Sequence, residues 1–202
     1  MVVLPSCTGS SPQTTAILPS PTTQEISPIE PLKGCQPEPF VVPTLPASIP
    51  PYTALDKSIG LHITGRHQVI DPETYRLKVS GKVNNPLEFT YDQIRCLPTV
   101  TADPLLVCVG YFEDKATWTG VKLETILDMA DIQADASTIV LVSADQYKVQ
   151  LSLTEALGQE SFLAYEVNGQ TLPILHGFPL RAVIPGSNGD DWIKWLVEIE
   201  VK

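Results

Sequence analysis

The chain has 202 residues, of which 43% are hydrophobic and 18% charged, so it can bury the core of one globular domain. Its formal net charge of −10 makes nucleic acids and anionic membrane surfaces poor partners, because both would repel it. No apolar run approaches the ~18 residues that a membrane-spanning helix needs.

The first 51 residues differ in composition from the rest. They hold twelve of the nineteen prolines and show no sustained helical or strand period. Because proline fixes φ and removes a backbone donor, residues 1–51 are predicted to form an extended, largely disordered tether, and residues 52–202 a globular domain. The opening MVVLPSC is similar to the end of a lipoprotein signal, which would lipidate Cys7 and tether the chain to a membrane; the alternative is an ordinary disordered terminus.

The first half of the globular part is predicted to contain strands and two short helices. Alternation predicts a strand over residues 75–79, and Asn-Asn-Pro at 84–86 predicts a turn. Residues 90–97 are predicted to form a short helix with Thr90 or Asp92 as its N-cap. Residues 105–109 form an apolar run, which predicts a buried strand, and residues 122–130 have the period of an amphipathic helix.

The second half is predicted to be mainly strands. These are residues 139–142 and 147–153 around a turn, 162–167 before the hairpin dipeptide Asn168-Gly169, 180–184, and an alternating strand over 195–201, with a short helix at 154–157. Helices do not alternate regularly with strands. The predicted fold class is therefore α+β, with a mixed, mainly antiparallel sheet and short helices.

The four cysteines form no CxxC pair and are too sparse for a disulfide scaffold. Cys96 is predicted to pack in its helix beside Ile94 and Leu97, although pairing with Cys35 stays open, since an oxidising compartment would permit it. Cys108 ends an apolar run. It is either a small buried hydrophobe or a thiolate metal ligand at a strand end.

Basic side chains cluster between residues 176 and 195. His176 and Arg181 flank a Gly-Phe-Pro turn, and Arg181 begins an apolar strand, where a cation needs an anion. With Lys194 they are predicted to converge on a large anionic ligand. The alternative is a surface salt-bridge set of Lys194 with Asp190 and Asp191.

Four segments occur in order between residues 61 and 202: RHQVIDPETYRLKVSG, LLVCVG with a following WTGV, LAYEVNGQTLPILHGFPLRAVIPG, and IKWLVEIEV. Together they resemble the molybdopterin-binding domain of the sulfite oxidase family, in its stand-alone bacterial branch. The resemblance implies the sulfite-oxidase-type fold and a molybdenum–molybdopterin cofactor ligated by Cys108. It implies a catalytic tyrosine at Tyr147 beside the metal, and cofactor contacts at Arg66, His67, Asp145, His176, Arg181, Trp192, Ile193 and Lys194. The alternative for Arg66 and His67 is an exposed loop.

The chain departs from the sulfite oxidase pattern after Cys108. Those enzymes continue with Ala-Gly-Asn-Arg-Arg, whereas here Val-Gly-Tyr-Phe precedes Glu113 and Asp114. An acidic loop would repel sulfite, so we expect oxygen-atom transfer with a small or protein-borne S-oxide or N-oxide.

The expected partner is a separate redox protein, since no haem, flavin or iron–sulfur motif is present in the sequence. The bacterial branch implies an extracytoplasmic location, periplasmic or at the cell surface. A monomer is expected because the family's dimerisation domain does not follow. The alternative function is a non-catalytic extracytoplasmic binding module that kept the fold and lost the metal.

Overall fold

The computed structural model describes residues 27–28, 34–158 and 160–202. Cys7, whose lipidation the sequence predicts, lies outside these residues, as does most of the predicted tether. The described helices are all too short or too polar to span a bilayer.

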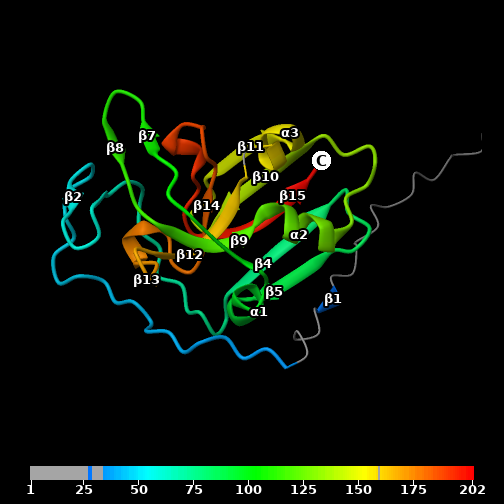
Figure 1. Cartoon of the computed structure of the whole chain (residues 1–202), viewed down its shortest axis with the longest axis horizontal. Helices are drawn as coiled ribbons and strands as arrows, with labels where there is room; N and C mark the ends of the chain where they lie inside the picture. Colours follow the sequence, from blue (N-terminus) through cyan, green and yellow to red (C-terminus); the bar gives the residue numbers. More distant parts are fainter. Residues whose placement is uncertain (1–26, 29–33, 159) are drawn as a thin grey trace, which may run out of the picture.

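A six-stranded mixed sheet forms one layer of the domain (Figure 1). Its order is β1-β5-β4-β15-β10-β11, and its pairs are antiparallel except β1 with β5 and β15 with β4. The strands are β1 (Ser27–Pro28), β4 (Arg76–Gly81), β5 (Leu87–Thr90), β10 (Thr138–Ser143), β11 (Lys148–Ser152) and β15 (Leu196–Val201).

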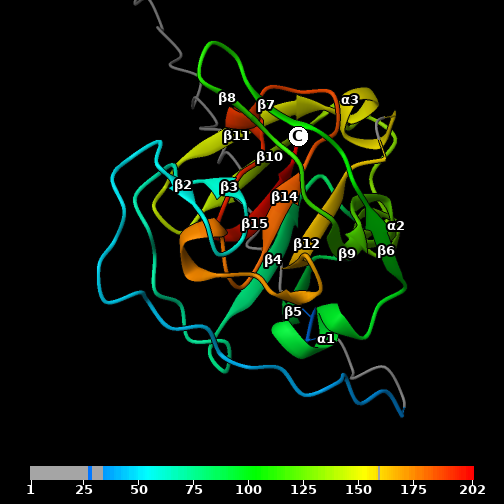
Figure 2. The same ribbon diagram turned by 60° about the vertical axis from the view of Figure 1, so that its left-hand side comes forward.

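A second, antiparallel sheet packs across the first (Figure 2). It contains β6 (Thr99–Ala102), β9 (Trp118–Lys122), β12 (Phe162–Val167) and β13 (Gln170–Thr171), with β14 (Arg181–Val183) also paired to β12. Two small hairpins complete the strands: β2 (Leu55–Asp56) with β3 (Leu61–His62), and β7 (Leu106–Cys108) with β8 (Phe112–Asp114). One apolar core joins both sheets and the helices. The predicted α+β class with a mixed, mainly antiparallel sheet is confirmed.

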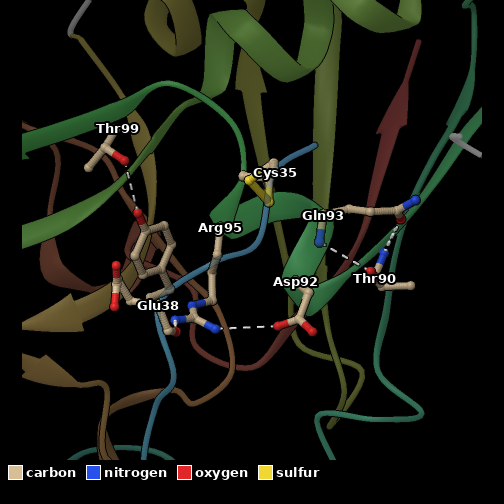
Figure 3. Close-up of a disulfide and its surroundings, with 9 residues drawn as sticks. Cys35, Glu38, Thr90, Asp92, Gln93, Arg95 and Thr99 are labelled. Atoms are coloured by element: carbon tan, nitrogen blue, oxygen red, sulfur yellow. Dashed lines mark hydrogen bonds and ion pairs between the residues drawn. A yellow bond between two sulfur atoms is a disulfide. The ribbon is translucent and has the colours of Figure 1, made fainter. Parts of the chain in front are cut away.

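In the described part of the chain, three short α-helices lie against the sheets, and local sequence explains their formation. In α1 (Tyr91–Arg95), the Thr90 hydroxyl accepts the Gln93 N–H and the Gln93 side chain accepts the Thr90 N–H, so both ends of this capping box are bonded (Figure 3). In α2 (Leu123–Ala130), the residues spaced for one face are all buried, as predicted. The third is α3 (Leu153–Gly158).

Two strand predictions need correction. The run at 105–109 is not a buried strand: Leu106 is buried, but Val109 is 71% exposed, because β7 pairs only with β8 and one bridge residue. In β15, a register shift opposite Val142 and Ser143 changes the phase of alternation, so Leu196 is buried while Val197 is only partly so.

Cys96 forms a disulfide with Cys35, so its predicted packing inside the helix is wrong (Figure 3). The physical reason is position: Cys96 is the C-cap of α1, beyond the buried face formed by Tyr91 and Ile94. Residues 35–54, most of which belong to the predicted tether, contain no helix or strand and lie along the surface of the domain (Figures 1 and 2).

Candidate functional site

Three adjoining cavities form one cleft at the carboxyl-terminal end of β10. The main cavity has a volume of about 360 Å³ and is lined by Asp145, Tyr147 and Lys194 among others. A pocket of about 20 Å³ at Cys108 shares Thr64, Gly189 and Asp190 with it. A third cavity, of about 280 Å³, shares Tyr52, Thr64 and Gly65 and is also lined by Arg66 and His67.

Cys108 lies at the end of β7 and faces the smallest of these cavities. Its thiol is free and its side chain is only partly buried, so it is not a small hydrophobe enclosed in the core. Burial raises the pKa of the Cys108 thiol, and the carboxylates of Asp190 and Asp114 raise it further. A bound metal cation would reverse this effect, because it favours the thiolate.

Gly189 explains how the loop after β14 reaches Cys108. A side chain at this position would meet a Leu106 methyl group and the Val107 carbonyl oxygen at 3.2 Å. The neighbouring Asn188 forms a bridge with Val107. Glycine therefore allows the loop to pack directly on β7 and to form a common wall of two cavities.

His62 and Asp114 form a pair in the same pocket that the sequence did not predict. The Asp114 carboxylate accepts the His62 backbone N–H at 2.7 Å and lies 2.6 Å from its ring Nδ1. The His62 ring stacks on Phe112, with centroids 4.3 Å apart. Asp114 is buried whereas Glu113 is exposed, so only one of the two residues of the predicted acidic loop faces solvent. The signal in the sequence was the alternation of side chains along β8, which places Glu113 and Asp114 on opposite faces of the strand.

Arg181, the first residue of β14, is a buried cation without an ion-pair partner in the described part of the chain. It is 4% exposed, and its guanidinium carbon lies 5.0 Å and 5.9 Å from the ring centroids of Trp118 and Trp192. One nitrogen donates to the His176 carbonyl at 3.4 Å, but Nε has no partner. Burial lowers the pKa of Arg181 to about 10. Arg181 is thus a buried charge that no direct ion pair neutralises among the described residues.

Lys194 is a second buried cation. Its Nζ donates to the carbonyls of Thr64 at 2.7 Å and Leu175 at 3.1 Å, and burial holds the pKa of Lys194 well below its usual range. Among the described residues it forms no ion pair, so the alternative of a surface salt bridge with Asp190 or Asp191 is wrong.

His176 lies beside these cations and is fully buried. Its Nε2 is 3.1 Å from an Asp56 carboxylate oxygen, while Nδ1 has no partner. Burial, followed by the Lys194 charge, lowers the pKa of His176 to about 4, so the ring is neutral at pH 7. Gly177 brings the three side chains together. Its φ is +115°, and an added Cβ would lie 3.2 Å from the Cβ atoms of both Arg181 and Lys194.

His176 lines none of the three cavities, whereas the remaining predicted site residues do, although not all of them lie near Cys108. Asp145 accepts the Tyr147 backbone N–H at 3.1 Å. Tyr147 is 50% exposed and lines the main cavity rather than the Cys108 pocket, with its hydroxyl 3.4 Å from the Asp190 carbonyl oxygen. Trp192 and Ile193 are buried and line the main cavity. Arg66 is exposed and His67 partly exposed, both at the third cavity.

These groups fit a large anion that carries many hydrogen-bonding atoms. Two buried cations form no ion pair with a carboxylate, and five buried side-chain polar atoms of the described residues lack any partner, of which Arg181 Nε and Trp192 Nε1 belong to residues that line the cavities. Buried polar atoms are normally bonded, so unpaired ones around a cleft indicate a ligand. A thiol at the end of the same cleft suits a soft or high-valent metal. The residues present therefore fit a metal-bearing pterin phosphate.

Comparison with known proteins agrees with this chemistry. The family model described as "Oxidoreductase molybdopterin binding domain" matches residues 64–202. Sulfite oxidase of Arabidopsis thaliana is 32% identical over 165 residues, which cover 64% of this chain and 42% of that protein. The "Putative protein-methionine-sulfoxide reductase subunit YedZ1" of Azospira oryzae is 31% identical over 120 residues, which cover 59% and 46%.

A solved structure shares the fold. Sulfane dehydrogenase SoxCD from Paracoccus pantotrophus matches with a TM-score of 0.64 at 23% identity, covering 71% of this chain and 41% of that one. The chain spans less than half the length of each of these three proteins. The predicted fold type and molybdenum–molybdopterin cofactor are confirmed, and the chain belongs to the molybdopterin-binding oxidoreductase family that includes sulfite oxidase.

Proposed function

We propose that this chain is an oxidoreductase in which the Cys108 thiolate binds molybdenum and an oxygen atom moves to or from a substrate. The observation that carries the proposal is the position of Cys108. Its free thiol lines a pocket that adjoins a cleft with two buried, unpaired cations. The bound cofactor supplies the redox chemistry. Cys108 orients the metal, while Arg181 and Lys194 bind the anionic part of the cofactor.

The charges around the Cys108 pocket favour an uncharged S-oxide or N-oxide over sulfite. The carboxylates of Asp114 and Asp190 line this pocket, and its basic member, Arg181, is buried beneath Trp118 and Trp192. Two negative charges near the metal repel an anion but not a neutral oxide. The Asp114 carboxylate also holds the His62 ring in place beside this pocket.

In this proposal the substrate is reduced. Reduction of an S-oxide takes two electrons and two protons, breaks the S–O bond and yields a thioether and water. The electrons come from a separate redox protein. One relative carries protein-methionine-sulfoxide reductase in its name, which supports a sulfoxide substrate.

We also propose an extracytoplasmic, monomeric protein, tethered through Cys7 if that residue is lipidated. The Cys35–Cys96 disulfide supports this location, because such bonds persist mainly in oxidising compartments.

The test is production in a molybdopterin-competent host, followed by molybdenum and pterin analysis. Assays then use a panel of S-oxides and N-oxides with a reduced dye as donor, and sulfite with an oxidised dye as acceptor. We expect stoichiometric metal, turnover of at least one oxide and none of sulfite. A folded protein without molybdenum would instead be the non-catalytic binding module, and rapid sulfite oxidation would refute the substrate assignment.

A further inference from the structure

We infer that residues 35–52 form a disulfide-anchored strap that completes the wall of the cofactor cleft and slows cofactor loss. The inference rests on the proposed cofactor site. The strap precedes the family match, which begins at residue 64, so the match itself assigns it no role.

The strap begins at the Cys35–Cys96 disulfide at the end of α1 and runs along the outside of the domain to β2 (Figures 1 and 2). At its far end it reaches the cleft. Ile49, Pro50 and Tyr52 line the cavity that contains Arg66 and His67. Tyr52 also lines the main cavity, together with Lys194. The last residues of the strap therefore form part of the surface that a cofactor in the cleft would contact.

The amino-terminal end of the strap is held by several interactions around α1. Besides the disulfide, the Arg95 guanidinium donates to the Glu38 carbonyl and lies 4.7 Å from the centre of the Phe40 ring. Phe40 packs edge-on against Tyr91, with ring centroids 5.0 Å apart. Figure 3 shows Cys35, Glu38 and Arg95 close together beside α1. This end is fixed to the domain about a dozen residues before the cleft.

The segment that follows the strap is held by hydrogen bonds. Thr53 N–H donates to the Ile63 carbonyl at 2.7 Å, and Ile63 N–H donates to the Ala54 carbonyl at 2.9 Å. Asp56 then contacts the buried His176 ring at 3.1 Å. The strap is thus tied to the domain on both sides.

The middle of the strap is weakly held. In the described structure residues 41–50 form no hydrogen bond with the domain, and Leu45 is the one hydrophobic side chain among them that packs against the core. A cavity of about 220 Å³ lies between Thr44, Pro46 and the domain residues Pro173 and Ile174. Such a segment keeps its position mainly because its ends are fixed.

Breaking the disulfide removes one covalent end. An external thiol reductant would deliver two electrons and two protons, break the S–S bond and leave Cys35 and Cys96 as thiols. The strap would then be held at that end by the contacts of Glu38 and Phe40 alone. The released chain gains conformational entropy when it detaches, and this gain opposes those contacts. The strap would therefore leave the cleft part of the time. Cofactor would load most readily into reduced protein and be retained best after oxidation.

The experiment compares cofactor retention in holoprotein variants that leave Cys108 unchanged. Cys35→Ser removes the disulfide, Tyr52→Ala removes the wall residue but keeps the disulfide, and Ser48→Ala alters an exposed strap residue that lines no cavity. Protein-bound molybdenum is measured over time after desalting. We expect Cys35→Ser and Tyr52→Ala to lose molybdenum about tenfold faster than wild type, and Ser48→Ala to match wild type. A thiol reductant should speed loss from wild type but not from Cys35→Ser.

Limited chymotrypsin digestion gives a second readout that needs no cofactor. Cleavage after Phe40 and Tyr52 should be about tenfold faster in Cys35→Ser than in wild type. Equal molybdenum retention together with equal cleavage would overturn the inference. If wild type binds molybdenum and reduces an oxide, that result leaves the proposed function intact. If wild type binds no molybdenum, the proposed function fails, and cleavage alone decides whether the disulfide holds the strap.

Discussion

Replacing Arg181 by methionine is predicted to stabilise the apoprotein while weakening cofactor binding. Burial lowers the pKa of Arg181 by more than two units, to about 10. Each pKa unit is worth about 1.4 kcal/mol, so the buried charge costs the folded apoprotein about 3 kcal/mol. Methionine keeps an unbranched, flexible side chain and removes the charge. It also loses the contacts of the guanidinium with Trp118 and Trp192, worth about 1 to 2 kcal/mol. The expected net gain is about 1 to 2 kcal/mol.

Urea unfolding of the apoprotein at pH 7 measures this gain, and the melting temperature should rise by about 4 °C for a chain of this size. Pterin content after production in a competent host should fall about tenfold or more, because a hydrogen bond between charged groups is worth about 1.5 to 3 kcal/mol. Arg76→Met is a suitable control. Arg76 is 41% exposed with a surface partner, so neither quantity should change much.

The opposite result would identify Arg181 as a structural ion. If Arg181→Met destabilised the apoprotein by about 2 kcal/mol and left pterin content unchanged, the charge would be compensated within the protein. The view of the cleft as an anion site would then be wrong.

Three further predictions concern other residues. Cys108→Ser should abolish oxidoreductase activity and leave the circular dichroism spectrum unchanged, since the substitution is nearly isosteric; retained turnover would refute the ligand assignment. The pKa of His176 is lowered to about 4, so between pH 6.5 and 4 the unfolded chain binds a proton that the folded apoprotein does not. The free energy of unfolding of the apoprotein should therefore be highest above pH 6.5 and fall by about 3 kcal/mol towards pH 4. If His176→Gln showed the same pH dependence as wild type, this prediction would be contradicted. Cys96→Ser opens a loop with a sequence separation of 61 residues and should lower the free energy of unfolding by about 4 kcal/mol; a loss below about 1 kcal/mol would mean that the bond does not constrain the chain.

Local signals predicted much of this structure. The spacing of apolar residues predicted α2, and Thr90 was among the predicted caps of α1. The convergence of His176, Arg181 and Lys194 could also be predicted, because they are close in sequence and Gly177 allows their close approach. These features depend on neighbouring residues, which a sequence displays directly.

Long-range features could not be predicted in the same way. His62 and Asp114 are 52 residues apart, and nothing local says that β3 and β8 meet. Residues 105–109 are as apolar as a core strand, but β7 pairs with β8 in a two-stranded hairpin and does not join either large sheet. Proline content predicted an extended tether over residues 1–51, and the described residues 35–51 contain no helix or strand. It gave no sign that Phe40 and the disulfide hold that segment against the domain.

Molybdenum K-edge X-ray absorption of purified holoprotein tests the central assignment most directly. Wild type and Cys108→Ser are compared at equal metal content. We predict one fewer sulfur neighbour around the metal in the variant. The same number of sulfur neighbours in both proteins would show that Cys108 does not bind the metal.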